Sequence, residues 1–177
     1  MKRLLLLTFP LLLAACAALG PPAINLSRSD ITERAFIDRA GFDTSKIFGG
    51  FGGLSITGPE VGLHTTAQRL EFAWVAKLKD SPLGFPLSIR ATISGTPMLN
   101  SQRNGIDLED ARVEEVRLPS IPFLNLDTRK ALKDGDTLGT IALLQFRPEE
   151  LNRDGIVYVP TALSLGSFGL RVDLSPK

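Results

Sequence analysis

The single cysteine and the single histidine limit the catalytic chemistry available to this 177-residue chain. One cysteine, Cys16, excludes a disulfide within the chain and leaves too few donors for a zinc site of Cys and His ligands. A Ser-His-acid or Cys-His arrangement would have to use His64, but the sequence identifies neither a neighbouring nucleophile nor an orienting acid. We therefore expect His64 to be a surface or hydrogen-bonded histidine, and we expect no enzymatic activity.

Two other patterns approach ligand-binding motifs without matching them. The glycine-rich segment Phe48–Gly53 lacks a following Gly-Lys-Ser/Thr and the dinucleotide spacing, so it predicts a loop. The alternative is a mobile lip whose two phenylalanines touch lipid or cover an opening. A set of acidic residues alternates with apolar ones and lacks the spacing of an EF-hand loop, which indicates a solvated strand face and not a calcium site. The members of this set are Asp107, Glu109, Asp110, Glu114 and Glu115. We expect the protein to bind neither a metal nor a cofactor.

The residues before Cys16 assign it a different role. Met1-Lys2-Arg3 is positively charged, and the apolar run Leu4–Leu13 is too short to cross a bilayer, which needs about 20 residues. This pattern is typical of a secretory signal, and Leu13-Ala14-Ala15-Cys16 resembles the lipobox of a bacterial lipoprotein. We predict that residues 1–15 are a signal peptide and that Cys16 carries the acyl chains. The alternative is an ordinary signal peptide cut nearby, with Cys16 as a free thiol.

The segment after Cys16 predicts where the protein is held. Ala17, in place of Asp, resembles the outer-membrane-sorted class of lipoproteins, which predicts a protein facing the periplasm. Residues 16–23 contain Gly20-Pro21-Pro22 and form the expected lipidated tether. The seven residues after Cys16, Ala17 to Ala23, reach roughly 23 Å when extended, so the domain should stay close to the bilayer.

The remaining residues, 24–177, have the length and composition of one globular domain. Lys and Arg total 20 and Asp and Glu total 19, a balance that argues against nucleic-acid binding. Hydrophobic residues make up 44% of the chain, which argues against wholesale disorder. A protein partner cannot be named from the sequence.

Local patterns predict an N-terminal helix. Ser27 and Asp30 have the spacing of a capping box, and Leu26 and Ile31 that of a hydrophobic staple. We expect the helix to continue to Arg39 or Ala40, with Gly41 just beyond its end.

Period-two alternation then predicts strands over 70–79 and 87–94. After the Asn104-Gly105 turn, the apolar phase changes twice, which predicts two β-bulges near Glu109-Asp110 and Glu114-Glu115. If both bulges exist, one interior face holds the following residues: Ile106, Ala111, Val113, Val116 and Leu118. Residues 137–146 suit a helix or a strand equally, and 156–159 and 170–174 read as strands. The expected fold is therefore α+β, with the N-terminal helix packed on a strongly curved, bulged antiparallel sheet.

The lipobox, the helix start at Ile24–Ile31 and the strand Gly105–Val113 together resemble the YceB-like family of small bacterial lipoproteins. That family is similar in fold to one half of a tubular lipid-binding (BPI-like) module, in which a curved sheet cradles a long helix. The resemblance covers roughly Ile24 to Leu118. Beyond it, glycines and a proline depart from the family's long C-terminal helices. The resemblance implies that the protein binds an apolar ligand.

Two functions follow as expectations. In the first, the lipoprotein holds a lipid acyl chain or another apolar ligand between helix and sheet. In the second, it is a structural or adaptor lipoprotein with a filled core that docks on an envelope partner. The expected lining of the apolar site is also the expected core stripe. It comprises Ile31, Phe36, Leu70, Phe72, Trp74, Leu87, Ile89 and Ile93.

Overall fold

The computed structural model of the chain describes residues 22–36, 54–78, 88–117 and 133–177. The predicted signal peptide, the predicted lipidation site Cys16 and the glycine-rich segment lie outside these ranges. So do Leu87, Leu118 and the expected helix residues beyond Phe36.

Five antiparallel strands form the first sheet, in the same order in space as in sequence. They are β2 (Leu54–His64), β3 (Arg69–Leu78), β4 (Ser88–Asn100), β5 (Gly105–Arg117) and β6 (Thr137–Gln145). Residues 137–145, which were equally compatible with a helix, are therefore a strand.

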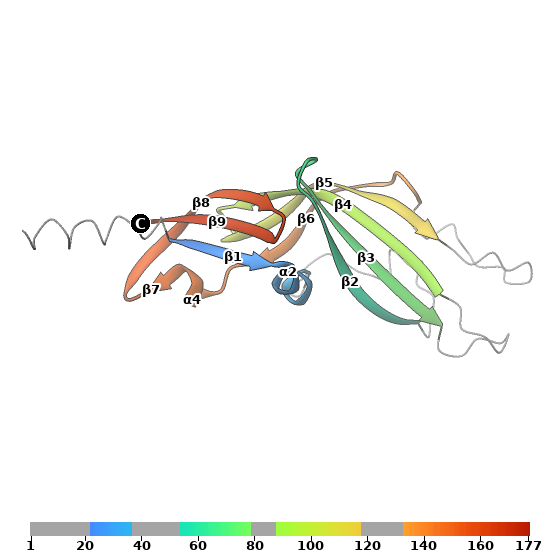
Figure 1. Cartoon of the computed structure of the whole chain (residues 1–177), viewed down its shortest axis with the longest axis horizontal. Coiled ribbons are helices and arrows are strands. Elements are labelled where there is room, and N and C mark those ends of the chain that lie inside the picture. Colours follow the sequence, from blue (N-terminus) through green and yellow to red (C-terminus); the bar gives the residue numbers. More distant parts are fainter. Residues whose placement is uncertain (1–21, 37–53, 79–87, 118–132) are drawn as a thin grey trace, which may run out of the picture.

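The second sheet joins the two ends of the chain. Its order is β1-β9-β8-β7, formed by β1 (Ala23–Ser27), β9 (Gly169–Pro176), β8 (Ile156–Gly166) and β7 (Asn152–Arg153). Among the described residues, two short helices accompany the sheets, α2 (Arg28–Arg34) and α4 (Pro148–Leu151). Figure 1 shows the sheets following one another along the long axis, with α2 at their junction. Strand β4 also contacts β8, which ties the two sheets together.

The predicted α+β fold is wrong, because strands in two sheets dominate the described chain. The helix expected to reach Arg39 or Ala40 ends at Arg34, after seven residues. Phe36 has φ of +63°, which no right-handed helix allows, and its amide donates to the Leu143 carbonyl of β6 at 2.7 Å. Tertiary pairing with β6 thus replaces the next helical hydrogen bond. The helix start is as expected, since Ser27 and Asp30 form a capping box.

Both predicted β-bulges are confirmed by the register of β4 with β5. Thr92 pairs with Glu115 and Ile93 with Val113, so Glu114 is the extra residue of one bulge. Ser94 pairs with Arg112 and Thr96 with Glu109, so two residues of β5 lie opposite Gly95. Asp110, one of those two, has φ of +47°. Each extra residue restores the apolar side chains to the same face.

One face of the first sheet is therefore continuously apolar. Directly paired residues of neighbouring strands lie on the same face, and the β4–β5 pairs include Ile93 with Val113 and Leu99 with Ile106. Of the predicted interior residues of β5, Val116 is half-buried and the others that are described are buried: Ile106, Ala111 and Val113.

The second sheet is curled so that its two edge strands approach each other. Strands β1 and β7 are three positions apart, about 14 Å in a flat sheet at roughly 4.8 Å per strand. Nevertheless, Arg153 of β7 donates to the Ala23 carbonyl of β1 at 3.3 Å. The sheet must bend for this side chain to bridge its edges.

Candidate functional site

The residues predicted to line an apolar site gather in one place. They come from α2, from the turn after it, and from β3 and β4, and they belong to a single buried cluster. Leu87 lies outside the described residues. The members that the structure places there are Ile31, Phe36, Leu70, Phe72, Trp74, Ile89 and Ile93.

Three aromatic rings occupy the centre of this cluster. The Phe36 ring meets the Phe72 ring edge-on, with centroids 5.0 Å apart, and its centroid lies 5.5 Å from that of Trp74. The Phe72 and Trp74 rings stack with centroids 6.2 Å apart. These separations are those of rings in van der Waals contact. The backbone turn at Phe36 therefore inserts its ring between the helix and the sheet.

The exposure of these side chains shows how tightly they pack. Ile31, Phe72 and Ile93 have 0% of their surface exposed, and Trp74 has 1%. A side chain that lined a space for an acyl chain would keep surface accessible to a water-sized sphere. The predicted site is therefore a filled core at these residues.

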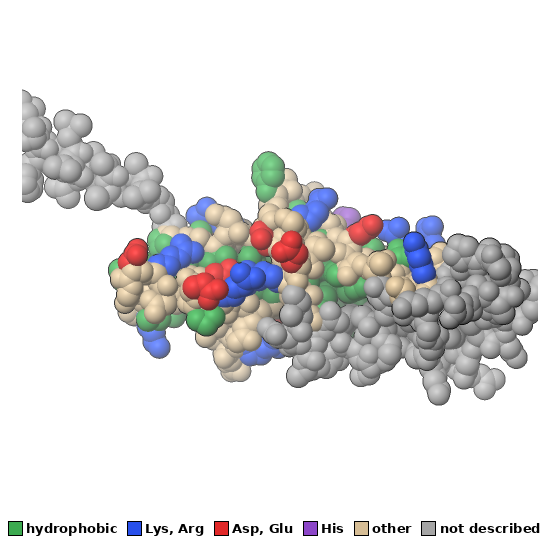
Figure 2. All heavy atoms as spheres, turned by 90° about the horizontal axis from the view of Figure 1, so that it is seen from below, with side chains coloured by type: hydrophobic (Ala, Val, Ile, Leu, Met, Phe, Trp, Pro, Cys, Tyr) green, Lys and Arg blue, Asp and Glu red, His purple; other side chains and the backbone are tan. Residues whose placement is uncertain are grey.

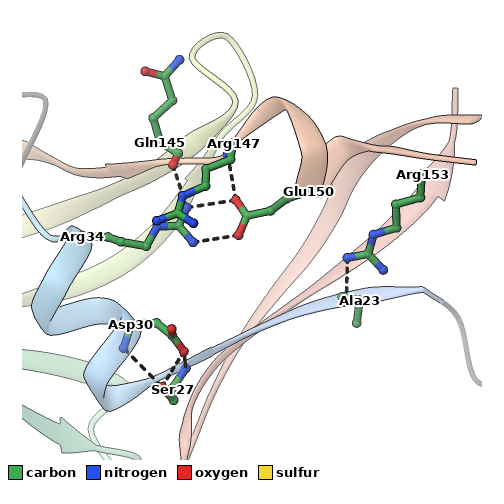
Figure 3. Close-up of polar contacts among 8 residues, drawn as sticks. All are labelled: Ala23, Ser27, Asp30, Arg34, Gln145, Arg147, Glu150 and Arg153. Carbon is green, nitrogen blue, oxygen red and sulfur yellow. Dashed lines mark hydrogen bonds and ion pairs between the residues drawn. The ribbon is translucent and has the colours of Figure 1, made fainter. Parts of the chain in front are cut away.

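A partly buried ion pair fastens α2 to the connection between β6 and α4 (Figure 3). The Arg34 guanidinium donates to both Glu150 carboxylate oxygens, at 2.7 and 2.9 Å, and to the Gln145 carbonyl at 2.9 Å. The Arg147 amide donates to the same carboxylate at 2.7 Å. Burial raises the pKa of Glu150, but these hydrogen bonds outweigh it and hold the pKa below its ordinary value. The pair therefore links α2 to the segment after β6 and stabilises the fold.

A second polar cluster lies on the opposite face of the first sheet from the core. Arg69 donates to the Ser94 hydroxyl at 2.9 Å, and that hydroxyl donates to the Glu114 carboxylate in the bulge of β5. The hydrogen bonds from Ser94 and then Arg112 lower the pKa of Glu114. A carboxylate with a lowered pKa is a weak general base, so this arrangement does not activate Ser94 as a nucleophile.

His64 lies at the end of β2 and is exposed, as expected for a surface histidine. Its Nε2 atom is 3.2 Å from the Glu71 carboxylate of β3, and both side chains face solvent. Within the four described ranges, no three His, Cys, Asp or Glu side chains come together as a metal site would require.

The hairpin between β8 and β9 forms an apolar surface feature that was not among the predicted site residues. Phe168 at its tip is 89% exposed, the highest value among the large hydrophobic residues that the structure describes as exposed. Beside it lies a groove of about 420 Å³, lined by the hairpin residues Ser164–Arg171 and by Asn25–Ser27 of β1. The motif Gly166-Ser167-Phe168-Gly169 is the sequence signal, because a turn between two strands rarely needs an aromatic residue.

Close packing fixes this hairpin against β1. A Cβ atom on Gly169 would lie 1.9 Å from the Leu26 carbonyl oxygen, and Gly169 has φ of +150°. Only glycine therefore fits at this position, and the groove depends on it.

Charge does not mark a further site on the face shown in Figure 2. There, acidic and basic side chains are interspersed, and no single-sign patch covers that face. In the described ranges, no helix has the length and apolar character needed to cross a membrane. No protein-family model, no curated protein and no solved structure matches the chain.

Proposed function

We propose that this chain is a lipoprotein of the cell envelope whose folded domain is an adaptor that docks on a protein partner. Acyl chains on Cys16 anchor it in the outer membrane, facing the periplasm. The packed core is the observation that favours an adaptor over a lipid carrier. With the Phe36, Phe72 and Trp74 rings in mutual contact, an acyl chain could enter only by displacing one of them.

The groove beside Phe168 is the docking surface in this proposal. Its lining combines leucine side chains with hydroxyl and amide groups, among them Asn25 and Ser164. Such polar groups can hydrogen-bond to a peptide backbone, whereas an acyl chain has no partner for them. The occupant is therefore a protein segment that covers Phe168 with an apolar side chain.

The strength of this contact follows from the area that Phe168 offers. An aromatic side chain buries about 150 Å² or more, and apolar burial contributes roughly 25 cal/mol per Å². Phe168→Ser should thus cost about 3 kcal/mol, or a hundredfold in affinity. Ile156→Ser is the matched control, because Ile156 is also exposed but lies at the other end of β8.

The first experiment tests the choice between adaptor and lipid carrier. A fluorescent fatty acid is titrated into the purified domain while energy transfer from Trp74 is followed. We expect no saturable binding in the micromolar range. Saturable binding would overturn the adaptor proposal in favour of a lipid ligand in the interior.

The second experiment tests the docking surface. A photo-crosslinking amino acid replaces Phe168 in cells, with His64 as the control position. The cross-linked partner is then purified and titrated with the wild-type, Phe168→Ser and Ile156→Ser domains. Equal affinities for all three would show that the groove is not the docking surface.

A further inference from the structure

One end of the second sheet presents aliphatic side chains to solvent. Ile156 is 47% exposed and Val157 is 49% exposed. Both belong to the β7–β8 hairpin, in which Asn152 pairs with Val157 and Arg153 pairs with Ile156. These two side chains therefore supply apolar surface that an adjoining lipid or protein surface could cover.

The tether toward Cys16 leaves the domain at this same end. Arg153, next to the hairpin turn, holds the Ala23 carbonyl at 3.3 Å, as Figure 3 shows. Pro22 runs beside β9, where its carbonyl accepts from the Leu174 amide at 2.9 Å. Lys177 donates its amide to the Val157 carbonyl at 2.9 Å, so the last residue of the chain also lies here. Figure 1 shows β7 and the end of β9 together beside the start of β1.

We propose that the β7–β8 hairpin rests on the lipid bilayer, with Ile156 and Val157 in its interface. This inference builds on the proposed anchor at Cys16. The tether reaches roughly 23 Å at most, so it keeps the hairpin beside the bilayer at high effective concentration. A contact too weak to recruit a free protein is then sufficient to orient a tethered one.

The opposite end of β1 carries the docking groove. Ala23 pairs with Asp173, whereas Ser27 pairs with Gly169 beside Phe168. Ala23 and Ser27 are four residues apart on an extended strand, which separates the two ends of β1 by about 14 Å. With the hairpin of Ile156 on the bilayer, the exposed Phe168 lies at the far end of the sheet and is accessible to a partner.

The charges near the hairpin are of both signs. Arg153 and Lys177 are basic, and Asp154 and Glu149 are acidic. Because they balance, the contact depends on apolar burial and not on anionic lipid. We therefore expect it to form on zwitterionic vesicles and to change little with salt.

The test uses the mature chain coupled through Cys16 to a maleimide-bearing phospholipid in phosphatidylcholine vesicles. Val157→Trp places a reporter on the hairpin, and Phe168→Trp is the matched control at the other end. The buried Trp74 supplies the same background in both proteins. Vesicles of dibrominated phosphatidylcholine quench tryptophan that reaches the acyl region.

We expect the dibrominated lipid to quench the emission of Val157→Trp. The quenching of Phe168→Trp should be no greater than that of the wild type. Ile156→Trp repeats the measurement if the first variant unfolds. Equal quenching at both ends, or none at the hairpin, would overturn the orientation. Because the coupling is chemical, this result is independent of whether cells lipidate Cys16, which palmitate labelling tests separately.

Discussion

The ion pair between Arg34 and Glu150 makes a quantitative prediction about stability. We consider Glu150→Gln, which removes the negative charge and keeps the shape of the side chain. In the wild type the carboxylate accepts three hydrogen bonds, two from Arg34 and one from the Arg147 amide. The variant leaves the Arg34 guanidinium without its counter-charge.

The magnitude follows from burial and from the type of bond. The side chains of Arg34 and Glu150 are 12% and 20% exposed, so solvent screens their attraction only in part. Hydrogen bonds to charged groups contribute about 1.5–3 kcal/mol, and breaking a fully buried pair costs about 3–5 kcal/mol. Because this pair keeps some exposure, we expect the free energy of unfolding to fall by about 2 kcal/mol.

The pH dependence of this loss has a definite sign. The pKa of Glu150 in the folded protein lies below its ordinary value of 4.5. Its contribution is therefore complete above that value and is lost as pH falls through the lower, folded pKa. The difference between wild type and Glu150→Gln should be constant from neutral pH to about pH 5.5 and shrink below the ordinary value.

The assay is urea unfolding of residues 16–177 carrying Cys16→Ser, followed by the fluorescence of Trp74. Glu149→Gln is the control, because Glu149 is the exposed neighbour on α4 and should change stability by less than about 0.5 kcal/mol. If Glu150→Gln costs no more than Glu149→Gln at neutral pH, the ion pair does not hold α2 to the rest of the fold.

Three further substitutions test the anchor, the hairpin and the core. Cys16→Ser should abolish palmitate labelling and release the protein from the membrane fraction; undiminished labelling would exclude the lipid anchor. Gly169→Ala should cost about 2 kcal/mol or more in urea unfolding, because its Cβ meets the Leu26 carbonyl oxygen at 1.9 Å. A stability equal to wild type would contradict that packing. Phe36→Ala should cost about 3–5 kcal/mol and shift the Trp74 emission, since the two rings are in contact. An unchanged emission spectrum would place Phe36 outside the core.

The two bulges show how much a local pattern can predict. The apolar residues of β5 change phase twice. If a single face of the strand is buried, each change requires one extra residue, which is a β-bulge. The register of β4 with β5 places the extra residues where the phase changes. The capping box of Ser27 and Asp30 is similarly local, because all its atoms come from four consecutive residues.

The candidate site was harder to predict from residue types. Sequence alternation identified Phe72, Trp74 and Ile93 as an interior stripe, and they are buried. It could not distinguish a stripe that lines a cavity from one that fills a core, because both require the same apolar side chains. That difference depends on the Phe36 ring, which a positive φ and a hydrogen bond to β6 direct onto the stripe.

The sequence alone determines the features that depend on neighbours along the chain: the predicted signal and lipobox, the helix start, the alternating strands and the bulges. Tertiary structure decided the rest. Strand β1 exists because it pairs with β9 at the other end of the chain. Its five residues are too few for an alternating pattern that would predict a strand. Residues 137–145 suited two structures, and pairing with β5 selected the strand. The predicted fold class was wrong for the same reason. The free energy of strand pairing depends on residues far apart in the sequence, and no short segment of sequence reveals it.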